Sequence, residues 1–513
     1  MVPLRRYRLA IDGNWVLGIK QHFGGADMKA EIIKVQMDFR DYVEQMKFHG
    51  LLHEISKPVN RDTEAGAIMR YLNDRGLPGP IFNNVKGSLE GSRLVGNLFN
   101  TFAGIAIACR LPPDINYHDL VDWFGEVIEK RMKPEVVSSG ECQQNVMIGD
   151  DVDITKLPAA KTHPKDGGRY LATLSNGICK DPESDWVNWG NYRGMIHDLK
   201  SMGLLLSPVN HGGQLLAKYH SRNQVMEYVQ FYGGDPLCTI IATSGIPHGD
   251  SEVDVVGGIR GRPVKLVKCK TVDMYVPADA EIVIEGTISP GDFQLEGPFG
   301  EYPGYVAADR IERPVFRVSA VTYRDNPILA TCCLGFPTDM LLANVSIVAM
   351  VKRSLIKAGI PISKVGIPKA ANRQGIVVST KTRVAGTAQM IANVVWADRN
   401  GTTQHYVVVV NDDIDPMDLN AVFHAILSKC NPATGIHLFP GAFNSPLAPY
   451  IKHPFKEKGM GGGNALFDCT WPVDWTPNDI PHRSDFRNTY PLDVQKSVVD
   501  LVSSWGLEKL PFD

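Results

Sequence analysis

Hydrophobic residues recur every three or four positions directly after Asp38, which is the spacing of one helical face. The apolar positions of this stretch are Phe39, Tyr42, Val43 and Met46. Gly50 follows them and is a typical helix stop. The pattern predicts a first helix between Asp38 and Gly50.

Residues 165–335 follow a different pattern. Residues 265–276 and 281–288 alternate or run apolar and contain many β-branched residues. Pro277 and Ser289-Pro290-Gly291 interrupt these runs, so we expect strands that break at both places. The region predicts a barrel or a folded-over sheet.

The remainder of the chain predicts a helix followed by a smaller α/β unit. Apolar residues between Val345 and Ile356 form a helical stripe, and Gly359 and Pro361 follow as stop signals. Tyr406–Val410 is an apolar run typical of a buried strand. Residues 416–430 predict a helix capped by Asp415, with Leu419, Val422, Phe423 and Ile426 on one face. A last amphipathic helix is expected over residues 492–507.

Composition adds limits to this picture. The chain has 513 residues, of which 44% are hydrophobic, and a net charge of -3, values typical of a globular protein with two or three domains. No basic block and no apolar run of about 18 residues stands out, so nucleic acid and membrane are not expected as partners. The nine scattered cysteines predict reduced thiols and a cytoplasmic location. Residues 1–36 are interpreted as an N-terminal extension, with mitochondrial targeting as the alternative.

The segment Glu296-Gly297-Pro298-Phe299-Gly300-Glu301 holds the most informative pair of side chains. The proline and glycines between the two glutamates favour a chain reversal that brings both acids into one pocket. Two acids in a partly dry pocket disfavour double ionisation, so one of them stays protonated near neutral pH. A solvated surface turn is the alternative interpretation of the same residues.

Other candidate residues lie far apart in the chain. Arg193 follows Asn188-Trp189-Gly190-Asn191, and its guanidinium suits bidentate binding of a carboxylate. If Asn188, His211 and Glu252 converge, their amide oxygen, imidazole and carboxylate suit Mn²⁺ or Mg²⁺. Spacing alone does not join them, and each also fits an ordinary structural role. No phosphate-binding loop, nucleophile elbow or His-Glu-x-x-His motif is present.

Taken together, these motifs resemble the UbiD-type decarboxylases that use prenylated FMN, from about Met37 to the C-terminus. The acid-rich turn at Glu296–Glu301 is the most specific element of the resemblance. The supporting elements are the Asn188–His197 segment, His211, Glu252, Leu266–Cys269, Tyr275–Ala278, Glu281–Gly286, Thr338-Asp339 and Tyr490-Pro491.

The resemblance implies an α/β (α+β) fold in which a central split β-barrel binds the flavin. It places the prenylated-FMN-binding domain at residues 37–335, with the split-barrel core at about 165–335. A linker helix over residues 336–362 would lead to a smaller α/β oligomerisation domain over 363–490, and residues 491–513 would form a C-terminal helix that can pack on a partner subunit. Homodimers or larger assemblies of dimers are implied, with a flavin prenyltransferase supplying the cofactor.

The resemblance also implies reversible, non-oxidative decarboxylation of an aromatic, heteroaromatic or α,β-unsaturated acid. Arg193, Glu296 and Glu301 match the catalytic network, with Glu301 as the proton donor. Asn188, His211 and Glu252 match the ligands of a Mn²⁺ ion that holds the flavin phosphate, with K⁺ nearby. The implied cofactor-binding residues are Asn188, Gly190, Asn191, Arg193, Asn210, His211, Ser244 and Glu252.

Several positions depart from the family pattern. Gly190 and Asn191 follow the Asn-Trp pair, Asn210 replaces a common glutamine, and Asn464 stands where a lysine reaching the cofactor phosphate is expected. Lys456 or Lys458 are candidates to compensate. The alternative functions are an FMN-dependent oxidoreductase on a split barrel and a non-catalytic assembly subunit. The substrate acid stays open, and Phe486 is a candidate to close over its ring.

Overall fold

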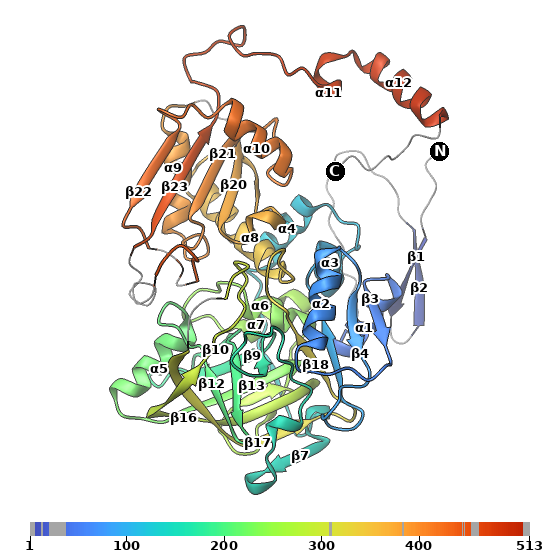
Figure 1. Cartoon of the computed structure of the whole chain (residues 1–513), viewed down its shortest axis with the longest axis vertical. Helices are drawn as coiled ribbons and strands as arrows, with labels where there is room; N and C mark the ends of the chain where they lie inside the picture. The colour runs from blue at the N-terminus through green and yellow to red at the C-terminus, as the bar shows by residue number, and fades with distance from the viewer. Residues whose placement is uncertain are drawn as a thin grey trace.

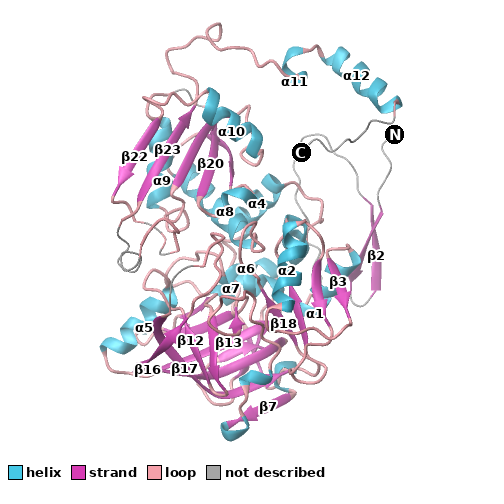
Figure 2. Cartoon of the chain, in the orientation of Figure 1, coloured by secondary structure: helices cyan, strands magenta, loops and turns pink. Residues whose placement is uncertain are grey.

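The computed structural model describes residues 6–11, 14–19, 37–306, 310–381, 384–443, 445, 447–452 and 461–505. Figure 1 shows a large lower body built around a curved sheet and a smaller upper body built around a second sheet. Figure 2 shows helices clustered where the two bodies meet. Within the predicted extension, β1 (Arg6–Ile11) and β2 (Asn14–Ile19) form an antiparallel hairpin.

A four-stranded sheet with flanking helices lies beside the curved sheet. Its strand order is β18-β5-β4-β3. The predicted first helix is confirmed as α1, because Asp38 forms a capping box with Asp41 and the chain then turns at Gly50, where φ is +69°. The elements are α1 (Phe39–Phe48), β3 (Leu52–Ile55), α2 (Glu64–Asp74), β4 (Gly79–Phe82), β5 (Arg93–Gly96), α3 (Phe102–Ala108), α4 (Tyr117–Val127) and β18 (Ile328–Thr331).

The central sheet has nine strands in the order β10-β9-β13-β16-β17-β12-β11-β8, with β7 pairing on β17. Its strands are β7 (Asn145–Ile148), β8 (Tyr170–Ala172), β9 (Asn176–Lys180), β10 (Val187–Gly190), β11 (Gly194–Asp198), β12 (Ser201–Leu204), β13 (Met226–Gly233), β16 (Ala280–Glu296) and β17 (Ile311–Tyr323).

The curl of this sheet follows from one short connection. Five strands separate β10 from β11 in the sheet order, so a flat sheet would hold them roughly 30 Å apart. Residues 191–193 alone connect them and reach at most about 15 Å. The sheet must therefore curl, and the resulting half-barrel matches the predicted folded-over sheet. Arg193 is the last residue of this connection, so it lies where the curl brings β10 and β11 together.

The predicted break at Ser289-Pro290-Gly291 is wrong. β16 continues through these residues, because β13 ends its pairing opposite Ile288 and Pro290 no longer needs a hydrogen bond on that side. An irregularity between Ile288 and Phe293 accommodates Gly291, whose φ is +77°. The break at Pro277 is confirmed, since strand β15 (Tyr275–Pro277) ends there.

Shorter elements surround the curved sheet, including three helices that the β-rich prediction missed. A three-stranded sheet has the order β15-β14-β6. The elements are β6 (Glu135–Val137), α5 (His211–Ser221), α6 (Pro236–Ala242), α7 (Glu252–Arg260), β14 (Lys265–Lys268) and β15 (Tyr275–Pro277). The 3₁₀ turns are Glu141–Gln143, Gly149–Asp151, Ile154–Lys156 and Lys369–Ala371.

The second sheet has the order β19-β20-β21-β23-β22, with β20, β21 and β23 parallel. Helix α8 (Leu342–Lys357) leads into it and packs against α4. The strands are β19 (Ile362–Gly366), β20 (Gly375–Thr380), β21 (Tyr406–Asn411), β22 (Ile436–Pro440) and β23 (Gly463–Cys469), and the helices are α9 (Thr387–Ala397), α10 (Leu419–Ser428), α11 (Phe486–Thr489) and α12 (Leu492–Ser504). We call residues 362–469 the C-terminal domain and residues 37–337 the N-terminal region.

Helix α10 differs from its prediction in its cap and in the exposure of its apolar face. α10 is capped by Asp418, whose side chain accepts from Ala421 N–H at 3.0 Å. Asp415 instead contacts His118 Nε2 at 2.8 Å. Of the predicted apolar face, Val422 is buried, whereas Leu419 and Phe423 are 44% and 58% exposed.

The C-terminal helix α12 extends away from the rest of the chain in Figure 1. None of its described residues is buried, and Leu492, Val494, Val498, Val499 and Leu501 are exposed. The last two residues of the predicted helix, 506 and 507, lie outside the described residues. Phe486, on α11, is 40% exposed and does not enter the core of this chain.

The structure also describes the cysteines and the hydrophobicity of the helices. All nine cysteines lie in the described part of the chain, and they are buried, free thiols. No helix among the residues with a described backbone combines the length and hydrophobicity that a bilayer span requires.

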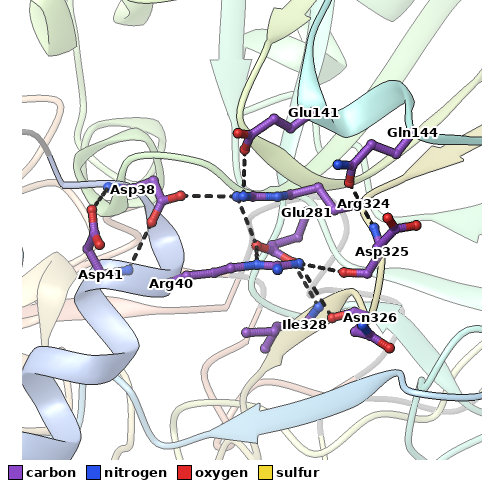
Figure 3. Close-up of polar contacts among 10 residues, drawn as sticks. All are labelled: Asp38, Arg40, Asp41, Glu141, Gln144, Glu281, Arg324, Asp325, Asn326 and Ile328. Carbon is purple, nitrogen blue, oxygen red and sulfur yellow. Dashed lines mark hydrogen bonds and ion pairs between the residues drawn. The ribbon is translucent and has the colours of Figure 1, made fainter. Parts of the chain in front are cut away.

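A buried carboxylate fastens the N-terminal helix to the curved sheet (Figure 3). Glu281 is fully buried at the start of β16, and Arg40 Nε and Nη2 donate to its two oxygens at 2.8 and 3.0 Å. Ile328 N–H also donates to Glu281, at 3.0 Å, and Arg324 Nη1 lies 3.4 Å away. Arg324 in turn donates to Asp38, the cap of α1, at 3.0 Å. The cluster therefore joins α1, β16, β17 and β18.

Removal of the Glu281 carboxylate should destabilise the fold. Glu281→Ala leaves Arg324 buried without this partner, so we expect a loss of about 3–5 kcal/mol and a lower midpoint of thermal unfolding by circular dichroism. Asp292→Ala is the control, since Asp292 pairs with Arg317 at a partly exposed site and should cost at most about 1 kcal/mol. Equal effects of the two substitutions would contradict the anchoring role of Glu281.

Candidate functional site

The predicted chain reversal brings both glutamates onto one arginine. Glu296 is the last residue of β16, and the turn at Gly297, with φ of +91°, returns the chain so that Glu301 lies beside it. Arg193 Nε and Nη2 donate to Glu296 at 3.0 and 2.8 Å, and Arg193 Nη1 donates to Glu301. The surface-turn alternative is wrong, because both glutamates are buried. We call Arg193, Glu296 and Glu301 the acid–arginine cluster.

Burial and charge act in opposite directions in this cluster. Burial raises the pKa of Glu301, and the neighbouring Arg193 guanidinium offsets only part of that increase. For Arg193 the balance is reversed: burial lowers its pKa, but the charges of Glu301 and Glu296 outweigh burial and leave the pKa raised. The arrangement keeps the arginine charged and favours a proton on Glu301.

Two further residues position the cluster, and the sequence analysis missed them. Tyr170, on β8, donates its hydroxyl to Glu296 at 2.7 Å. Its ring packs on Phe299, with 4.2 Å between ring centroids. The buried Asp166 accepts from Gly300 N–H at 3.0 Å and so holds the residue that precedes Glu301. No local signal marks Tyr170 or Asp166, because their partners are more than 100 residues away.

The three predicted metal ligands also converge, and all three are buried. Asn188 Oδ1 lies 3.1 Å from His211 Nδ1. Glu252 accepts from Trp189 N–H at 2.7 Å. His211 and Glu252 are the first residues of α5 and α7, so two helix N-termini meet beside Asn188. Within the described residues, no group of three His, Cys, Asp or Glu side chains forms a metal cluster, and the amide of Asn188 is what completes this set.

The donor set fits a divalent cation. Burial raises the pKa of Glu252 to about 8, and burial together with Arg399 and His248 lowers the pKa of His211 to about 3. A buried carboxylate beside a neutral imidazole and an amide oxygen offers the ligands that Mn²⁺ accepts. A bound cation would compensate the cost of ionising Glu252 in this place.

Tyr192 organises the ligand set and was also missed. Its hydroxyl accepts from Asn188 Nδ2 at 3.0 Å and from Gly212 N–H at 2.9 Å. A Cβ atom at Gly190 or Gly212 would lie within 2.6 Å of the Tyr192 ring or hydroxyl, so both positions require glycine. Both glycines are visible in the sequence. Gly212 lies 20 positions after Tyr192, however, so the sequence does not show that the two glycines pack against this side chain.

The other predicted cofactor residues have structural tasks in this conformation. Asn210 caps α5 by accepting from Gly213 N–H at 2.8 Å, and Ser244 donates to Ile240 O at 2.8 Å. Asn191 lies in the connection that carries Arg193, and its buried Nδ2 has no hydrogen-bond partner in the part of the chain that the structure describes. That orphaned donor is available to a bound ligand.

Asn464 lies at the start of β23 beside His405. Burial lowers the pKa of His405 to about 4, and the neighbouring Asn464 side chain counteracts part of this decrease. Neither residue carries a charge near neutral pH. Lys456 and Lys458, the predicted substitutes for the expected lysine, lie outside the described residues.

The hydroxyl of Tyr192 should be needed for metal retention. Tyr192→Phe leaves the Asn188 and Gly212 donors buried without this acceptor, which costs about 1–3 kcal/mol for each unsatisfied donor. We expect a lower unfolding midpoint and less retained Mn²⁺ after dialysis, measured by mass spectrometry. Tyr71→Phe, at a 55% exposed position, is the control. Unchanged metal content in Tyr192→Phe would contradict this role.

Three family models match the chain. They describe the N-terminal, Rift-related and C-terminal domains of the UbiD-type 3-octaprenyl-4-hydroxybenzoate carboxy-lyases, and they match residues 43–124, 135–337 and 341–469. Ferulic acid decarboxylase 1 of Saccharomyces cerevisiae is 30% identical over 91% of this chain and 97% of its own length. Pyrrole-2-carboxylic acid decarboxylase of Pseudomonas aeruginosa is 28% identical over 92% of this chain and 98% of its own.

Solved structures agree with the sequence relatives. The UbiD-class enzyme HmfF of Pelotomaculum thermopropionicum, in complex with FMN, superposes with a TM-score of 0.78 at 25% identity, covering 88% of this chain and 97% of its own. Vanillic acid decarboxylase of Sedimentibacter hydroxybenzoicus, in its closed form, gives 0.79 at 25% identity, covering 92% and 100%. The predicted family and fold class are confirmed, and the chain belongs to the UbiD family of carboxy-lyases.

Proposed function

We propose that the protein catalyses reversible, non-oxidative decarboxylation of an aromatic, heteroaromatic or α,β-unsaturated carboxylic acid with prenylated FMN. The observation that carries the proposal is Arg193 held between two buried glutamates. Decarboxylases of pyrrole-2-carboxylic and ferulic acids among the relatives, and an FMN complex among the structural neighbours, support it.

The chemistry explains why a cofactor is needed. Loss of CO₂ from an sp² carbon leaves an electron pair that no amino-acid side chain can accept. Prenylated FMN, when bound, supplies the electron sink. The buried Asn191 Nδ2, which has no hydrogen-bond partner among the described residues, and the neighbouring cluster offer polar groups to such a ligand.

The residues of the cluster have separate tasks in this proposal. Arg193 orients the substrate carboxylate; three of its N–H groups are used by the glutamates, and a guanidinium has five. Glu301, which burial favours in the protonated form, delivers a proton to the carbon that loses CO₂. Glu296 fixes the guanidinium with the help of Tyr170. The protein thus performs binding, orientation and proton transfer.

Asn188, His211 and Glu252 would hold Mn²⁺ beside the cofactor phosphate, with K⁺ nearby. In this role the ion anchors the cofactor, because its ligands belong to a different set from the acid–arginine cluster. The buried carboxylate of Glu252 supports a bound cation, and the adjacent N-termini of α5 and α7 support a phosphate beside it.

A second copy of the chain is the proposed partner, and the C-terminal domain together with helix α12 is the proposed contact. Large apolar side chains are exposed on α10, β22 and α12: Leu419, Phe423, Leu427, Leu438, Leu492 and Val499. A flavin prenyltransferase would supply the cofactor. The buried free thiols support a reducing, cytoplasmic compartment.

Glu301→Gln should abolish turnover and keep the flavin, because an amide cannot donate the proton. The measurement is CO₂ release from a panel of aromatic acids by cofactor-loaded protein, together with the flavin absorbance. In the unsubstituted protein, activity should fall as the pH rises and Glu301 ionises, since its pKa is raised. Glu312→Gln, at an exposed position of β17, is the control. Near-normal turnover in Glu301→Gln would remove Glu301 from its proposed role.

Asn188→Ala and His211→Ala should each lose metal and flavin together. The retained Mn²⁺ and flavin are measured after gel filtration by mass spectrometry, which also distinguishes prenylated from ordinary FMN. Ordinary FMN with redox turnover would favour the oxidoreductase alternative, and a loaded protein that releases no CO₂ from any acid would favour the assembly-subunit alternative. His53→Ala, at an exposed position of β3, should retain both ligands. Full retention of metal and flavin by both site variants would refute the metal assignment.

A further inference from the structure

We infer that Asn372 of the C-terminal domain is a positioning residue for Glu301. Its side chain fixes the turn that carries this glutamate, so proton delivery depends on a contact across the domain boundary. The inference rests on the proposed role of Glu301 as the proton donor. It names a residue that the sequence analysis did not select and that belongs neither to the acid–arginine cluster nor to the metal ligands.

Glu301 begins a tight turn that two backbone hydrogen bonds close. Glu301 N–H donates to Tyr305 O at 3.1 Å, and Gly304 N–H donates to Glu301 O at 3.0 Å. Gly304 has a φ of +90°, a conformation that favours glycine. Because the turn fixes the backbone at Glu301, it sets the direction in which the Glu301 side chain leaves the chain.

Two parts of the protein hold this turn from its two sides. Before Glu301, the Asp166 carboxylate accepts from Gly300 N–H at 3.0 Å. After Glu301, the Asn372 side chain donates its Nδ2–H to Tyr302 O. Glu301 therefore lies between a contact from the N-terminal region and a contact from the C-terminal domain.

The Tyr302 side chain makes further contacts with the C-terminal domain. The Arg373 guanidinium lies 4.6 Å from the Tyr302 ring centre, within the range of a cation–π interaction. The Tyr302 hydroxyl lies 3.5 Å from the hydroxyl of Ser445, which is buried. The residue next to Glu301 thus meets the C-terminal domain with its carbonyl, its ring and its hydroxyl.

The segment that presents Asn372 is itself held in place. It follows the 3₁₀ turn Lys369–Ala371, where Lys369 Nζ donates to Asn100 O of the N-terminal region at 3.3 Å. Asn372 is buried, and Asn372 and Arg373 have φ of +48° and +60°. These values cost free energy for residues other than glycine, so the surrounding contacts must maintain them. A strained, buried amide on the turn of a proposed proton donor indicates a role at the site.

Proton delivery is sensitive to such a contact. When Glu301 gives up its proton, the O–H bond breaks and the electron pair on the carbon that has lost CO₂ forms a C–H bond, which leaves Glu301 as a carboxylate. This transfer needs the two atoms within hydrogen-bond reach, and a displacement of about 1 Å can cost about a hundredfold in rate. Arg193 is held separately by two hydrogen bonds to Glu296. Loss of the Asn372 amide should therefore lower kcat and leave the binding of the substrate carboxylate intact.

Asn372→Asp and Asn372→Gly test the inference in cofactor-loaded, full-length protein. Aspartate keeps the shape and tolerates the same φ, but its carboxylate cannot donate to Tyr302 O; glycine removes the amide and adopts this φ without strain. With a panel of aromatic and α,β-unsaturated acids, we expect kcat per bound flavin to fall about ten- to a hundredfold in both variants, with KM nearly unchanged. The solvent deuterium isotope effect on kcat should be no smaller than in the unsubstituted protein, because proton delivery is the step that is slowed.

Hydrogen exchange followed by mass spectrometry tests the same contact without turnover. The peptide that covers residues 299–306 reports the amides of Glu301 and Gly304, which the turn protects. We expect faster exchange of this peptide in both variants. Exchange of peptides from β13 should stay unchanged, which shows that each variant is folded.

Asn223→Asp and Asn223→Gly are the matched controls. Asn223 is an exposed asparagine two residues after α5, and its φ is +52°. The same two substitutions therefore act there on a similar backbone conformation. They should leave kcat, KM and the exchange of residues 299–306 as in the unsubstituted protein.

Four outcomes would overturn the inference. Unchanged exchange of residues 299–306 would exclude the contact. Unchanged kcat per bound flavin in both variants would show that Glu301 does not need it. A smaller isotope effect would show that a step other than proton delivery has become limiting. Absence of CO₂ release by the unsubstituted protein from any acid would overturn the inference together with the proposed function, whereas the first three outcomes leave the proposed function intact.

Discussion

The buried ion pairs between Arg193 and its two glutamates are the interaction on which the site depends. A guanidinium and two carboxylates in a dry environment are costly unless each charge is matched. Here Glu296 takes two donors of Arg193, and Glu301 contacts the third. Burial raises the pKa of Glu301, and the one carboxylate in excess adds to this effect, so a proton on Glu301 is favourable.

The curvature of the central sheet brings Arg193 and its two glutamates together. The connection between β10 and β11 is too short for a flat sheet. It therefore forces the curl and places Arg193 where these two strands come together. β16 runs past the end of β13 and delivers Glu296 to the same place, and the turn after it returns Glu301. Tyr170 and Asp166 then fix the acids from β8 and from the loop before it. The fold therefore constrains both partners of the ion pairs by backbone geometry.

The two domains share the site at both of its ends. Near Glu301, the Asn372 side chain of the C-terminal domain donates to Tyr302 O, and the Arg373 guanidinium lies 4.6 Å from the Tyr302 ring centre. Asn372 and Arg373 both have positive φ, a conformation that costs free energy for residues other than glycine and that the surrounding contacts must maintain. Near His211, the Asp398–Asn400 turn makes the corresponding contact. A relative movement of the domains would change both ends of the site together.

The sequence by itself determined the local features: the capped helix after Asp38, the buried strand at Tyr406–Val410, and the turn that pairs Glu296 with Glu301. These depend on spacing and turn chemistry over a few residues, which a single sequence displays. It also identified the family through several ordered motifs. Where local signals misled, a distant partner was the cause: β16 tolerates Pro290 because β13 has ended, and Asp415 contacts His118 instead of capping α10. Only the tertiary structure brought Asn188, His211 and Glu252 together and added Tyr170, Asp166 and Tyr192. It also left Leu419 and Phe423 of α10 exposed, together with most apolar residues of α12. Contacts between residues tens to hundreds of positions apart leave no periodic trace in the chain.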